Sequence, residues 1–293
     1  MKLLGTYKNG TYTVSIYDDG TKIREGKEFI AAFPENIDLK ITNKCDLECP
    51  MCHEKSTING KEGNLLNEKF IDSLHPFTEM AIGGGNALSH KDLVPFLKKL
   101  KEKHIIANLT VNQTHFLLEK DFIISLINEE LIYGIGVSVF YPNEDLIETL
   151  EKIPNAVIHL IAGIATKETF EKMYDKNLKI LLLGYKDFGR GENYKVKYSK
   201  SITENMEYLK NNLPKISKHF AVISFDNLAL KQLEVERFLT PKMWEEFYMG
   251  DDGSHTMYID LVERKFGKNS TSKVRYELKD TIEEMFEVVK NEQ

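Results

Sequence analysis

The residues that most directly indicate chemistry are Cys45, Cys49 and Cys52, which are all the cysteines of the 293-residue chain. Three residues separate the first pair and two separate the second pair. Thiolates at such short spacings hold iron–sulfur clusters, usually with four cysteines per cluster. A set of only three would leave one iron of a four-iron cluster without a protein ligand. That iron could bind a substrate or a cofactor.

A zinc site is the alternative interpretation, because Cys45, Cys49, Cys52 and His53 together make a Cys₃His set. Zinc sites usually draw paired ligands from two separate segments, and this sequence has no second CxxC pair. Under this hypothesis the protein is a zinc- or iron–sulfur-bearing structural or redox-sensing module without radical chemistry. The spacing favours the catalytic cluster.

The CxxxCxxC motif follows an expected strand at 37–41, and this arrangement resembles the radical S-adenosylmethionine (radical SAM) enzymes. The resemblance covers residues 37–138 and extends more loosely to Arg190. It implies a [4Fe–4S] cluster on the three cysteines, with S-adenosylmethionine bound at the open iron. It also implies reductive cleavage of that cofactor to a 5′-deoxyadenosyl radical, which abstracts hydrogen from the substrate. The substrate stays open between a peptide, a nucleotide-derived metabolite and a nucleic-acid base.

The glycine-rich segment Gly83-Gly84-Gly85-Asn86 resembles the family's Gly-Gly-Glu segment, which binds the methionine part of the cofactor. Glycines let a backbone approach a ligand closely. The departure from the family is Asn86, which replaces a glutamate. Its amide can accept a hydrogen bond from the cofactor's ammonium, but without the charge that strengthens such a bond. A tight turn between a strand and a helix would also explain the glycines.

Three more residues match cofactor-binding positions of the family. Met51 precedes the last cysteine, where relatives commonly place an aromatic residue whose backbone meets the adenine. Asn112 and Ser138 end two expected strands, and similar positions bind the ribose and the carboxylate of the cofactor. The alternative is that Met51 packs the loop and that the other two residues form turns, for which their types are common.

Five charged or titratable residues are candidates for substrate contact: Asp38, Lys40, His53, Lys186 and Arg190. Asp38 and Lys40 share the polar face of the first strand, and His53 directly follows the cysteines. Lys186 and Arg190 lie after the sixth strand, where they could contact a carboxylate or a phosphate. The alternative for these two is that they are solvated loop residues.

The elements that must position these residues alternate between strand and helix, which is typical of a parallel sheet with crossover helices. Strands are expected at 37–42, 79–83, 105–112, 133–140, 156–164 and 178–184. Apolar residues such as Leu39 alternate with polar ones such as Lys40, so only one face of each strand should meet the helices. We therefore predict an α/β fold, a partial (β/α)₆ TIM-like barrel with a polar interior. His159, on the fifth strand, is expected to be a hydrogen-bonded core histidine.

Helices are expected between the strands at 67–74, 93–100, 121–128, 143–153 and 166–174, with Asn67 and Asn143 as N-caps. Ser201-x-x-Glu204 has the pattern of a capping box that begins a sixth helix. The preceding segment, 194–200, interleaves basic and aromatic residues. We interpret it as an exposed edge strand, and it is only a weak indication of nucleic-acid binding.

Three regions follow from these patterns. Residues 1–35 form a β-hairpin appendage, with a hairpin or short meander at 5–25 bounded by Asn-Gly and Asp-Gly turns. Residues 36–191 form the radical SAM core barrel. Residues 192–293 form a C-terminal α+β extension that completes and caps the barrel, with strands near 220–225 and 257–262 and a terminal helix over 278–289.

The composition indicates the setting of the protein. A net charge of −6 argues against a surface that coats nucleic acid, although a local basic groove is not excluded. Clustered cysteines suit a reducing compartment, and no apolar run is long enough for a signal peptide or a membrane span. We expect a cytoplasmic protein with no membrane partner. The family resemblance implies a small reductant protein, such as flavodoxin or ferredoxin, as electron donor.

Overall fold

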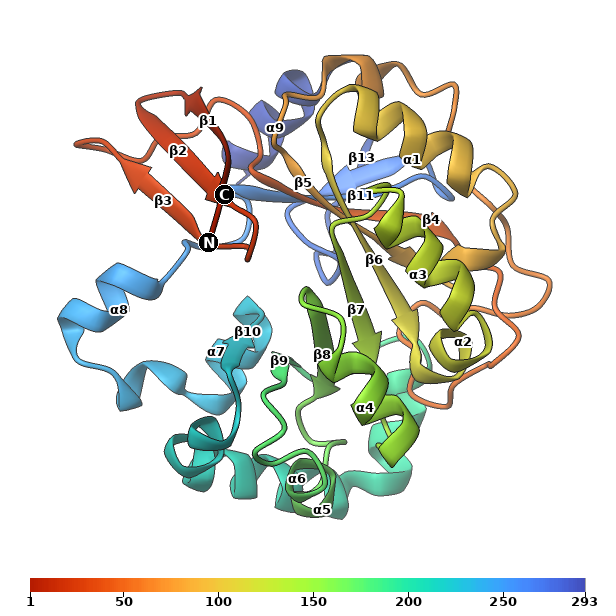
Figure 1. Ribbon diagram of the computed structural model, residues 1–293, viewed down its shortest axis with the longest axis vertical. Helices are drawn as coiled ribbons and strands as arrows, with labels where there is room; N and C mark the ends of the chain where they lie inside the picture. The colour runs from red at the N-terminus through yellow and green to blue at the C-terminus, as the bar shows by residue number, and fades with distance from the viewer. Residues whose placement is uncertain (293) are drawn as a thin grey trace.

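The large sheet of the protein carries the predicted strands. The computed structural model describes residues 1–292 and contains two sheets (Figure 1). The large sheet has ten strands in the order β10-β9-β8-β7-β6-β5-β4-β11-β12-β13. Its strands are β4 (Asn36–Thr42), β5 (Glu79–Gly84), β6 (Ile106–Asn112), β7 (Gly134–Ser138), β8 (Ala156–Ile161), β9 (Lys179–Leu183), β10 (Val222–Phe225), β11 (Thr256–Asp260), β12 (Lys265–Gly267) and β13 (Tyr276–Glu277).

The strands from β4 to β9 are the six that the sequence predicts, and each runs parallel to its neighbours. β10 and β11 add parallel strands at opposite sides, whereas β12 and β13 are antiparallel. The α/β class and the large parallel sheet are therefore confirmed. A barrel is not, because neither sheet closes on itself within residues 1–292. β10 and β13 are the free edges.

The helices are α1 (Leu93–Glu102), α2 (Gln113–Leu118), α3 (Lys120–Asn128), α4 (Glu144–Glu151), α5 (Lys167–Glu171), α6 (Arg190–Ile216), α7 (Asn227–Leu233), α8 (Pro241–Phe247) and α9 (Ile282–Lys290). Those from α1 to α6 lie on the outer side of the large sheet, which curves around the centre of the view in Figure 1, whereas α8 lies apart from this sheet. Short 3₁₀ turns occupy Lys69–Ser73, Ala87–Ser89, Ser217–His219 and Val235–Phe238. Asn143 caps α4 as predicted, because its side chain accepts a hydrogen bond from the Leu146 N–H.

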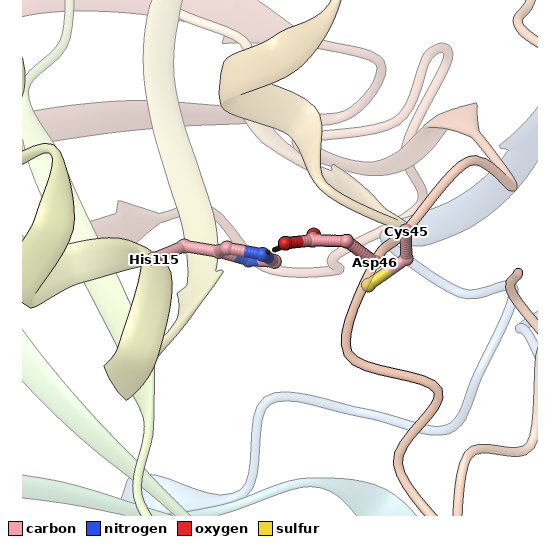
Figure 2. A group of neighbouring side chains, drawn as sticks. All are labelled: Cys45, Asp46 and His115. Atoms are coloured by element: carbon pink, nitrogen blue, oxygen red, sulfur yellow. Dashed lines mark hydrogen bonds and ion pairs between the residues drawn. The ribbon is translucent and has the colours of Figure 1, made fainter. Parts of the chain in front are cut away.

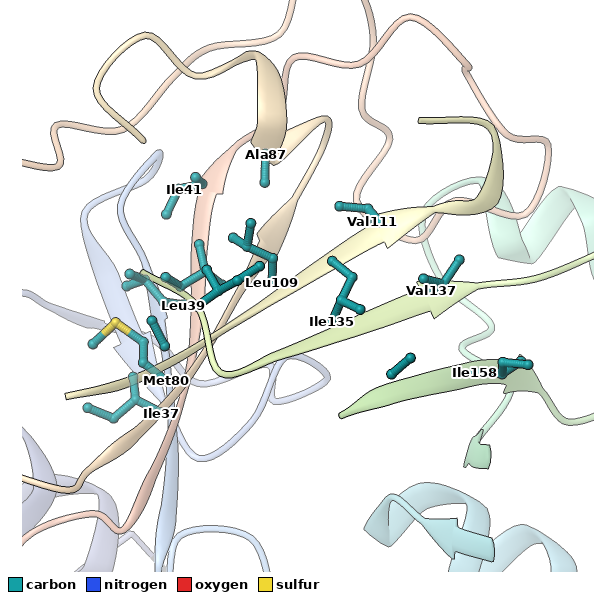
Figure 3. Close-up of a cluster of buried hydrophobic side chains, with 14 of the residues drawn as sticks. Ile37, Leu39, Ile41, Met80, Ala87, Leu109, Val111, Ile135, Val137 and Ile158 are labelled. Atoms are coloured by element: carbon teal, nitrogen blue, oxygen red, sulfur yellow. The ribbon is translucent and has the colours of Figure 1, made fainter. Parts of the chain in front are cut away.

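Alternation along the strands divides the sheet into an outer apolar face and an inner polar face. Figure 3 shows the outer cluster, in which Leu39 of β4, Leu109 of β6 and Ile135 of β7 pack together and are buried. Burying one such side chain contributes about 1.5–3 kcal/mol. Asp38 lies on the opposite face of β4 and is exposed. The inner face is therefore the face on which polar side chains can meet a ligand.

Strand register places the inner-face residues in rows. One row joins Tyr258 of β11, Asp38 of β4 and Ala81 of β5. Further along the strands, Asn112 of β6 and His159 of β8 flank Ser138 of β7. Since the strands are parallel, their carboxyl ends share one edge of the sheet.

Three local predictions are wrong. Residues Lys69–Ser73 form only a 3₁₀ turn, whose cap position is Glu68 rather than Asn67. The capping box at Ser201 and the edge strand at 194–200 both fall inside α6, a single long helix kinked at Tyr198. α6 begins at Arg190, and tertiary contacts of that residue, described below, explain why the local pattern is misleading.

The N-terminal region forms the small sheet, an antiparallel meander of β1 (Leu3–Asn9), β2 (Tyr12–Tyr17) and β3 (Lys22–Glu25). The predicted hairpin or meander is confirmed, with one more strand than a hairpin. The small sheet is attached through buried Glu35, which accepts hydrogen bonds from Tyr12 Oη and Arg24 Nε. Among residues 1–292, the helices are all too short or too polar to cross a membrane.

Candidate cluster and cofactor site

The three cysteines lie in the loop that leaves the carboxyl end of β4. We call residues 43–63 the cysteine loop. Its backbone is tied to itself, because the Cys45 N–H donates to the Thr57 carbonyl at 2.8 Å. It is also tied to the end of β5, because the Asn86 N–H donates to the Lys44 carbonyl at 2.7 Å. The loop is thus held at the edge where parallel strands place binding residues.

The three thiols lie in one loop, near enough for their charges to act on one another. Each is half-buried and none forms a disulfide. Burial raises the pKa of Cys49, and the adjacent thiols of Cys52 and Cys45 raise it further. Burial also raises the pKa of Cys45, against hydrogen bonds from the backbone of Leu47 and Glu48 that lower it. Three neighbouring sulfur ligands, all reachable from solvent, fit a cluster that keeps one position open.

A histidine and an aspartate lie beside the first cysteine. Figure 2 shows the ring of His115, from α2, directed at the Asp46 carboxylate, with the Cys45 thiol next to it. The distance from His115 Nε2 to Asp46 Oδ1 is 2.7 Å, and this hydrogen bond lowers the pKa of Asp46. The ligand atoms of all three residues lie within 4.8 Å of one another. His115 is not among the predicted site residues, although it lies just past the predicted strand end at Asn112.

Asn112 holds the same side of the cysteine loop. Its Oδ1 accepts a hydrogen bond from the Thr114 N–H at 2.9 Å and so caps α2. Its Nδ2 points at the Cys49 sulfur at 3.9 Å. The turn-forming role and a place beside the cysteines are therefore both observed. Binding of a cofactor ribose by Asn112 stays a prediction.

Arg190 fastens the opposite side of the loop. Its N–H donates to the Cys52 carbonyl at 3.0 Å, and its guanidinium donates to the carbonyls of Cys49 and Ser56, both at 2.9 Å. The preceding Gly189 has a φ of +64°, and a Cβ there would lie 2.1 Å from the His53 carbonyl oxygen. Arg190 therefore positions the cysteine loop. A substrate contact by Arg190 stays a prediction, and it would use a guanidinium that already donates to two carbonyls of this loop.

Two of the predicted cofactor glycines are needed by the protein itself. Gly84 has a φ of +117°, and a Cβ there would lie 2.3 Å from the Thr42 carbonyl oxygen. A Cβ on Gly85 would lie 2.2 Å from the Lys44 carbonyl oxygen. Gly84 thus lets the end of β5 pack against the end of β4, and Gly85 lets it pack against the cysteine loop. Gly83 differs, because a Cβ there would meet only Thr110 within 4 Å, which leaves open space in front of the sheet.

The side-chain oxygen of Asn86 is buried and has no hydrogen-bond partner within residues 1–292. Leaving such an acceptor unpaired costs about 1–3 kcal/mol. Asn86 directly follows the glycines, and its backbone N–H donates to the Lys44 carbonyl in the cysteine loop. An unpaired acceptor at this place fits a ligand that brings a donor, as the predicted cofactor ammonium would.

The remaining predicted cofactor residues lie nearby. Met51 is half-buried in the cysteine loop, and Ser138 is half-buried at the end of β7. His159, beside Ser138, is also half-buried, and a Cβ on Gly136 would lie 2.4 Å from its ring. Its side chain has no hydrogen-bond partner in the described chain, and burial lowers the pKa of His159 to about 4. The expectation of a hydrogen-bonded core histidine is therefore wrong, because the ring faces the inner side of the sheet.

Lys40 is a buried ion-pair residue. Its ammonium donates to Glu54 at 2.6 Å and to Asp260 at 3.0 Å. Burial opposes the charge, but these two carboxylates outweigh burial and raise the pKa of Lys40. Glu54 belongs to the cysteine loop and Asp260 ends β11, so the pair connects the loop to two strands. Substrate contact by Lys40 stays a prediction that has to compete with these partners.

His53, from the cysteine loop, and Lys186, which follows β9, are in contact. Lys186 Nζ lies 3.3 Å from His53 Nε2 and donates to Ser270 Oγ at 2.8 Å. Burial lowers the pKa of Lys186, and burial together with the Lys186 charge lowers the pKa of His53. The His53 ring nitrogen also lies 3.3 Å from Glu54 Oε1. The two predicted substrate residues thus share one polar network.

No protein-family model and no curated protein matches the sequence. Several solved structures match the fold, among them crystal structures of SuiB from Streptococcus suis. SuiB bound to S-adenosylmethionine matches with a TM-score of 0.55 and 15% identity, over 88% of this chain and 64% of SuiB. SuiB bound to the precursor peptide SuiA matches with a TM-score of 0.51 and 14% identity, over 81% of this chain and 60% of SuiB.

These matches show that the chain has the fold of SuiB. A third structure, of SuiB alone, gives a TM-score of 0.51 at 14% identity and again covers 64% of SuiB. The chain therefore spans less than two thirds of the SuiB length. At such low identity the likeness concerns the arrangement of helices and strands, and the chemistry has to be argued from this chain's own residues.

Proposed function

We propose that the protein is a radical SAM enzyme in which Cys45, Cys49 and Cys52 hold a [4Fe–4S] cluster and S-adenosylmethionine binds at the open iron. The observation that carries this proposal is that three half-buried thiols, close enough to affect one another's pKa, share one loop at the carboxyl edge of the sheet. The unpaired oxygen of Asn86 and the SuiB-like fold support it independently.

The chemistry that the cluster and cofactor supply when bound is hydrogen abstraction by a 5′-deoxyadenosyl radical. The protein positions the cysteine loop through Arg190 on one side and through Asn112 and His115 on the other. Asn86 orients the cofactor by accepting a hydrogen bond from its ammonium. Open space in front of Gly83 gives the substrate access to the inner face.

For the substrate and the electron donor we propose only chemical classes. Binding of a precursor peptide by SuiB makes a peptide the first substrate class to test. A nucleotide-derived metabolite and a nucleic-acid base are the other classes. A flavodoxin or a ferredoxin would deliver the electron.

The competing hypothesis is a zinc site. The predicted Cys₃His set requires the His53 ring on the metal, whereas that ring contacts Lys186 and Glu54. Cys45, Asp46 and His115 lie close enough to share an ion instead. A zinc-bearing module of this kind would bind metal without cleaving S-adenosylmethionine.

Anaerobic reconstitution distinguishes the two functions. We expect about four irons and matching sulfide per chain, because three thiolates with an open iron suffice for one [4Fe–4S] cluster. With dithionite and S-adenosylmethionine, the reduced protein should slowly produce 5′-deoxyadenosine even without substrate. One zinc per chain, with no absorbance of the protein in the visible range, would identify the zinc-bearing module instead. If all the S-adenosylmethionine is recovered intact although the cluster is fully reduced, the proposal of a radical SAM enzyme is refuted.

Asn86 gives a second prediction, on cofactor affinity. Asn86→Leu should weaken S-adenosylmethionine binding by about 1–3 kcal/mol, because the cofactor ammonium loses its acceptor. Asn86→Glu is the matched variant and should preserve or tighten binding, because a carboxylate makes a charge-assisted bond about twice as strong. Calorimetry on folded, cluster-loaded variants measures both. An unchanged affinity in Asn86→Leu would mean that the cofactor lies elsewhere.

A further inference from the structure

The side-chain amide of Asn112 lies beside one of the three cluster cysteines. Its Nδ2 donates to the Cys49 sulfur at a distance of 3.9 Å. Within residues 1–292, no other side chain donates a hydrogen bond to a cysteine sulfur. The hydrogen bonds to the Cys45 sulfur come instead from the backbone of the cysteine loop itself, at Leu47 and Glu48. Asn112 therefore gives the thiols a hydrogen-bond donor from outside their own loop.

The orientation of this amide is fixed by the helix that it caps. The Asn112 Oδ1 accepts a hydrogen bond from the Thr114 N–H at 2.9 Å. A flipped amide would place its own N–H groups against the Thr114 N–H, so Nδ2 has to be the atom that is directed at Cys49. The amide carries two N–H groups, and the second stays available for the predicted cofactor contact.

Both ends of the contact are held in place by the fold. The capped helix, α2, buries the Phe116 side chain completely in the core. The same helix is bonded to the cysteine loop, because His115 Nε2 lies 2.7 Å from Asp46 Oδ1. On the other side of the loop, the Arg190 guanidinium donates to the Cys49 carbonyl at 2.9 Å. The contact therefore joins two anchored segments of backbone.

The charge on the sulfur determines how strong this hydrogen bond is. The distance of 3.9 Å applies to a free thiol, which is a weak acceptor. A cysteine that ligates iron is a thiolate, and hydrogen bonds to charged acceptors are shorter and about twice as strong. Reduction of a cluster adds one more negative charge, so the same donor is bound more strongly in the reduced state. Hydrogen bonds to the sulfurs are one of the factors that set the reduction potential of a cluster.

We propose that Asn112 is a positioning residue that raises the reduction potential of the cluster, by donating an N–H···S hydrogen bond to the Cys49 thiolate. This inference rests on the enzyme proposed above. It gives Asn112 a role besides the cap of α2 and besides a contact with the cofactor. The role concerns the electron transfer that has to precede cofactor cleavage.

Asn112→Ser separates this role from the helix cap. Serine is also a good N-cap, so α2 keeps its cap, but the shorter side chain has no amide N–H to reach Cys49. The midpoint potential is measured without S-adenosylmethionine, by a reductive titration followed by electron paramagnetic resonance. At a fixed potential, the ratio of reduced to oxidised cluster should fall about three- to tenfold, the effect of one hydrogen bond, which is about 28–59 mV for a one-electron couple.

Asn112→Asp is the second variant, because aspartate has nearly the same shape and also caps helices, but it has no N–H and adds a negative charge. Its cluster should have a lower potential than the wild type, and lower than Asn112→Ser. Asn143→Ser is the matched control. Asn143 caps α4 in the same way, since its Oδ1 accepts from the Leu146 N–H at 2.9 Å. This control should keep the wild-type potential.

A wild-type potential in Asn112→Ser would overturn the proposal, and so would an equal shift in Asn143→Ser, because a changed cap would then explain both. A higher potential in Asn112→Asp would also contradict it. 5′-Deoxyadenosine formation by the wild type is measured in parallel. If the wild type cleaves the cofactor and Asn112→Ser keeps its potential, the enzyme stands and this role of Asn112 fails. If the potentials shift as expected but the cofactor is never cleaved, the proposed function fails and the N–H···S bond stands.

Discussion

Alanine at Cys45, Cys49 or Cys52 is expected to remove the iron–sulfur cluster and all cofactor cleavage. Each thiol supplies one of only three protein ligands, so a single loss leaves two, too few to hold four irons against solvent. Iron content should fall from about four per chain to near zero. 5′-Deoxyadenosine formation should become undetectable. The fold should persist, because these thiols are half-buried in a loop and contribute no core packing.

Ile58→Ala is the control for damage to the cysteine loop. Ile58 lies in the same loop with 59% of its surface exposed, so truncating it should change neither iron content nor cofactor cleavage. Circular dichroism on all four variants checks that each remains folded. A cysteine variant that keeps the wild-type iron content and cleaves the cofactor would not be a ligand. Loss of zinc instead of iron would support the structural module.

The strands could be predicted because their two faces differ chemically. Leu39 meets the helices while Asp38 and Lys40 face inward, and this alternation is visible in the sequence at a period of two residues. The same signal does not report how many strands the sheet recruits. A strand is expected near 257–262, but the sequence does not show that it pairs with the first strand, as β11 does with β4 from more than two hundred residues away.

Local patterns failed where tertiary contacts decide the structure. The Ser201 pattern is a sound helix start by itself, but α6 begins at Arg190, where the turn at Gly189 and three bonds to the cysteine loop fix the chain. The same holds in the site. The cysteines could be predicted as a site because they are close together in the sequence. His115 and Asp46 are 69 residues apart, and no local spacing predicts their contact.

Lys40 illustrates the limit most clearly. Its place on the polar face of β4 is predictable, and from the sequence that face suggests a ligand. The structure adds a partner from the cysteine loop, Glu54, and one that lies 220 residues away, Asp260. Polar residues on an inner face can therefore serve the protein as well as a substrate, and only the partners distinguish the two roles.

Lys40→Met is expected to destabilise the protein by about 3–5 kcal/mol, the usual cost of removing one member of a buried ion pair. The Lys40 side chain is only 6% exposed, and methionine would leave the carboxylates of Glu54 and Asp260 facing each other without a cation. The loss should appear as a lower denaturant midpoint, measured on variants with equal cluster loading. Because Glu54 belongs to the cysteine loop, cluster loading itself should also become less complete.

Lys69→Met is the matched control, since Lys69 pairs with Asp280 at a similar 2.8 Å but is 74% exposed. Water and salt screen an exposed pair, so this variant should barely move the midpoint. Glu54→Gln combined with Lys40→Met should recover part of the loss, because one of the stranded charges is then removed. If the Lys40→Met protein is as stable as the Lys69→Met control, the buried ion pairs of Lys40 do not stabilise the fold as proposed. Wild-type stability combined with weakened substrate binding would instead place Lys40 in the substrate site, because only a ligand would then depend on its charge.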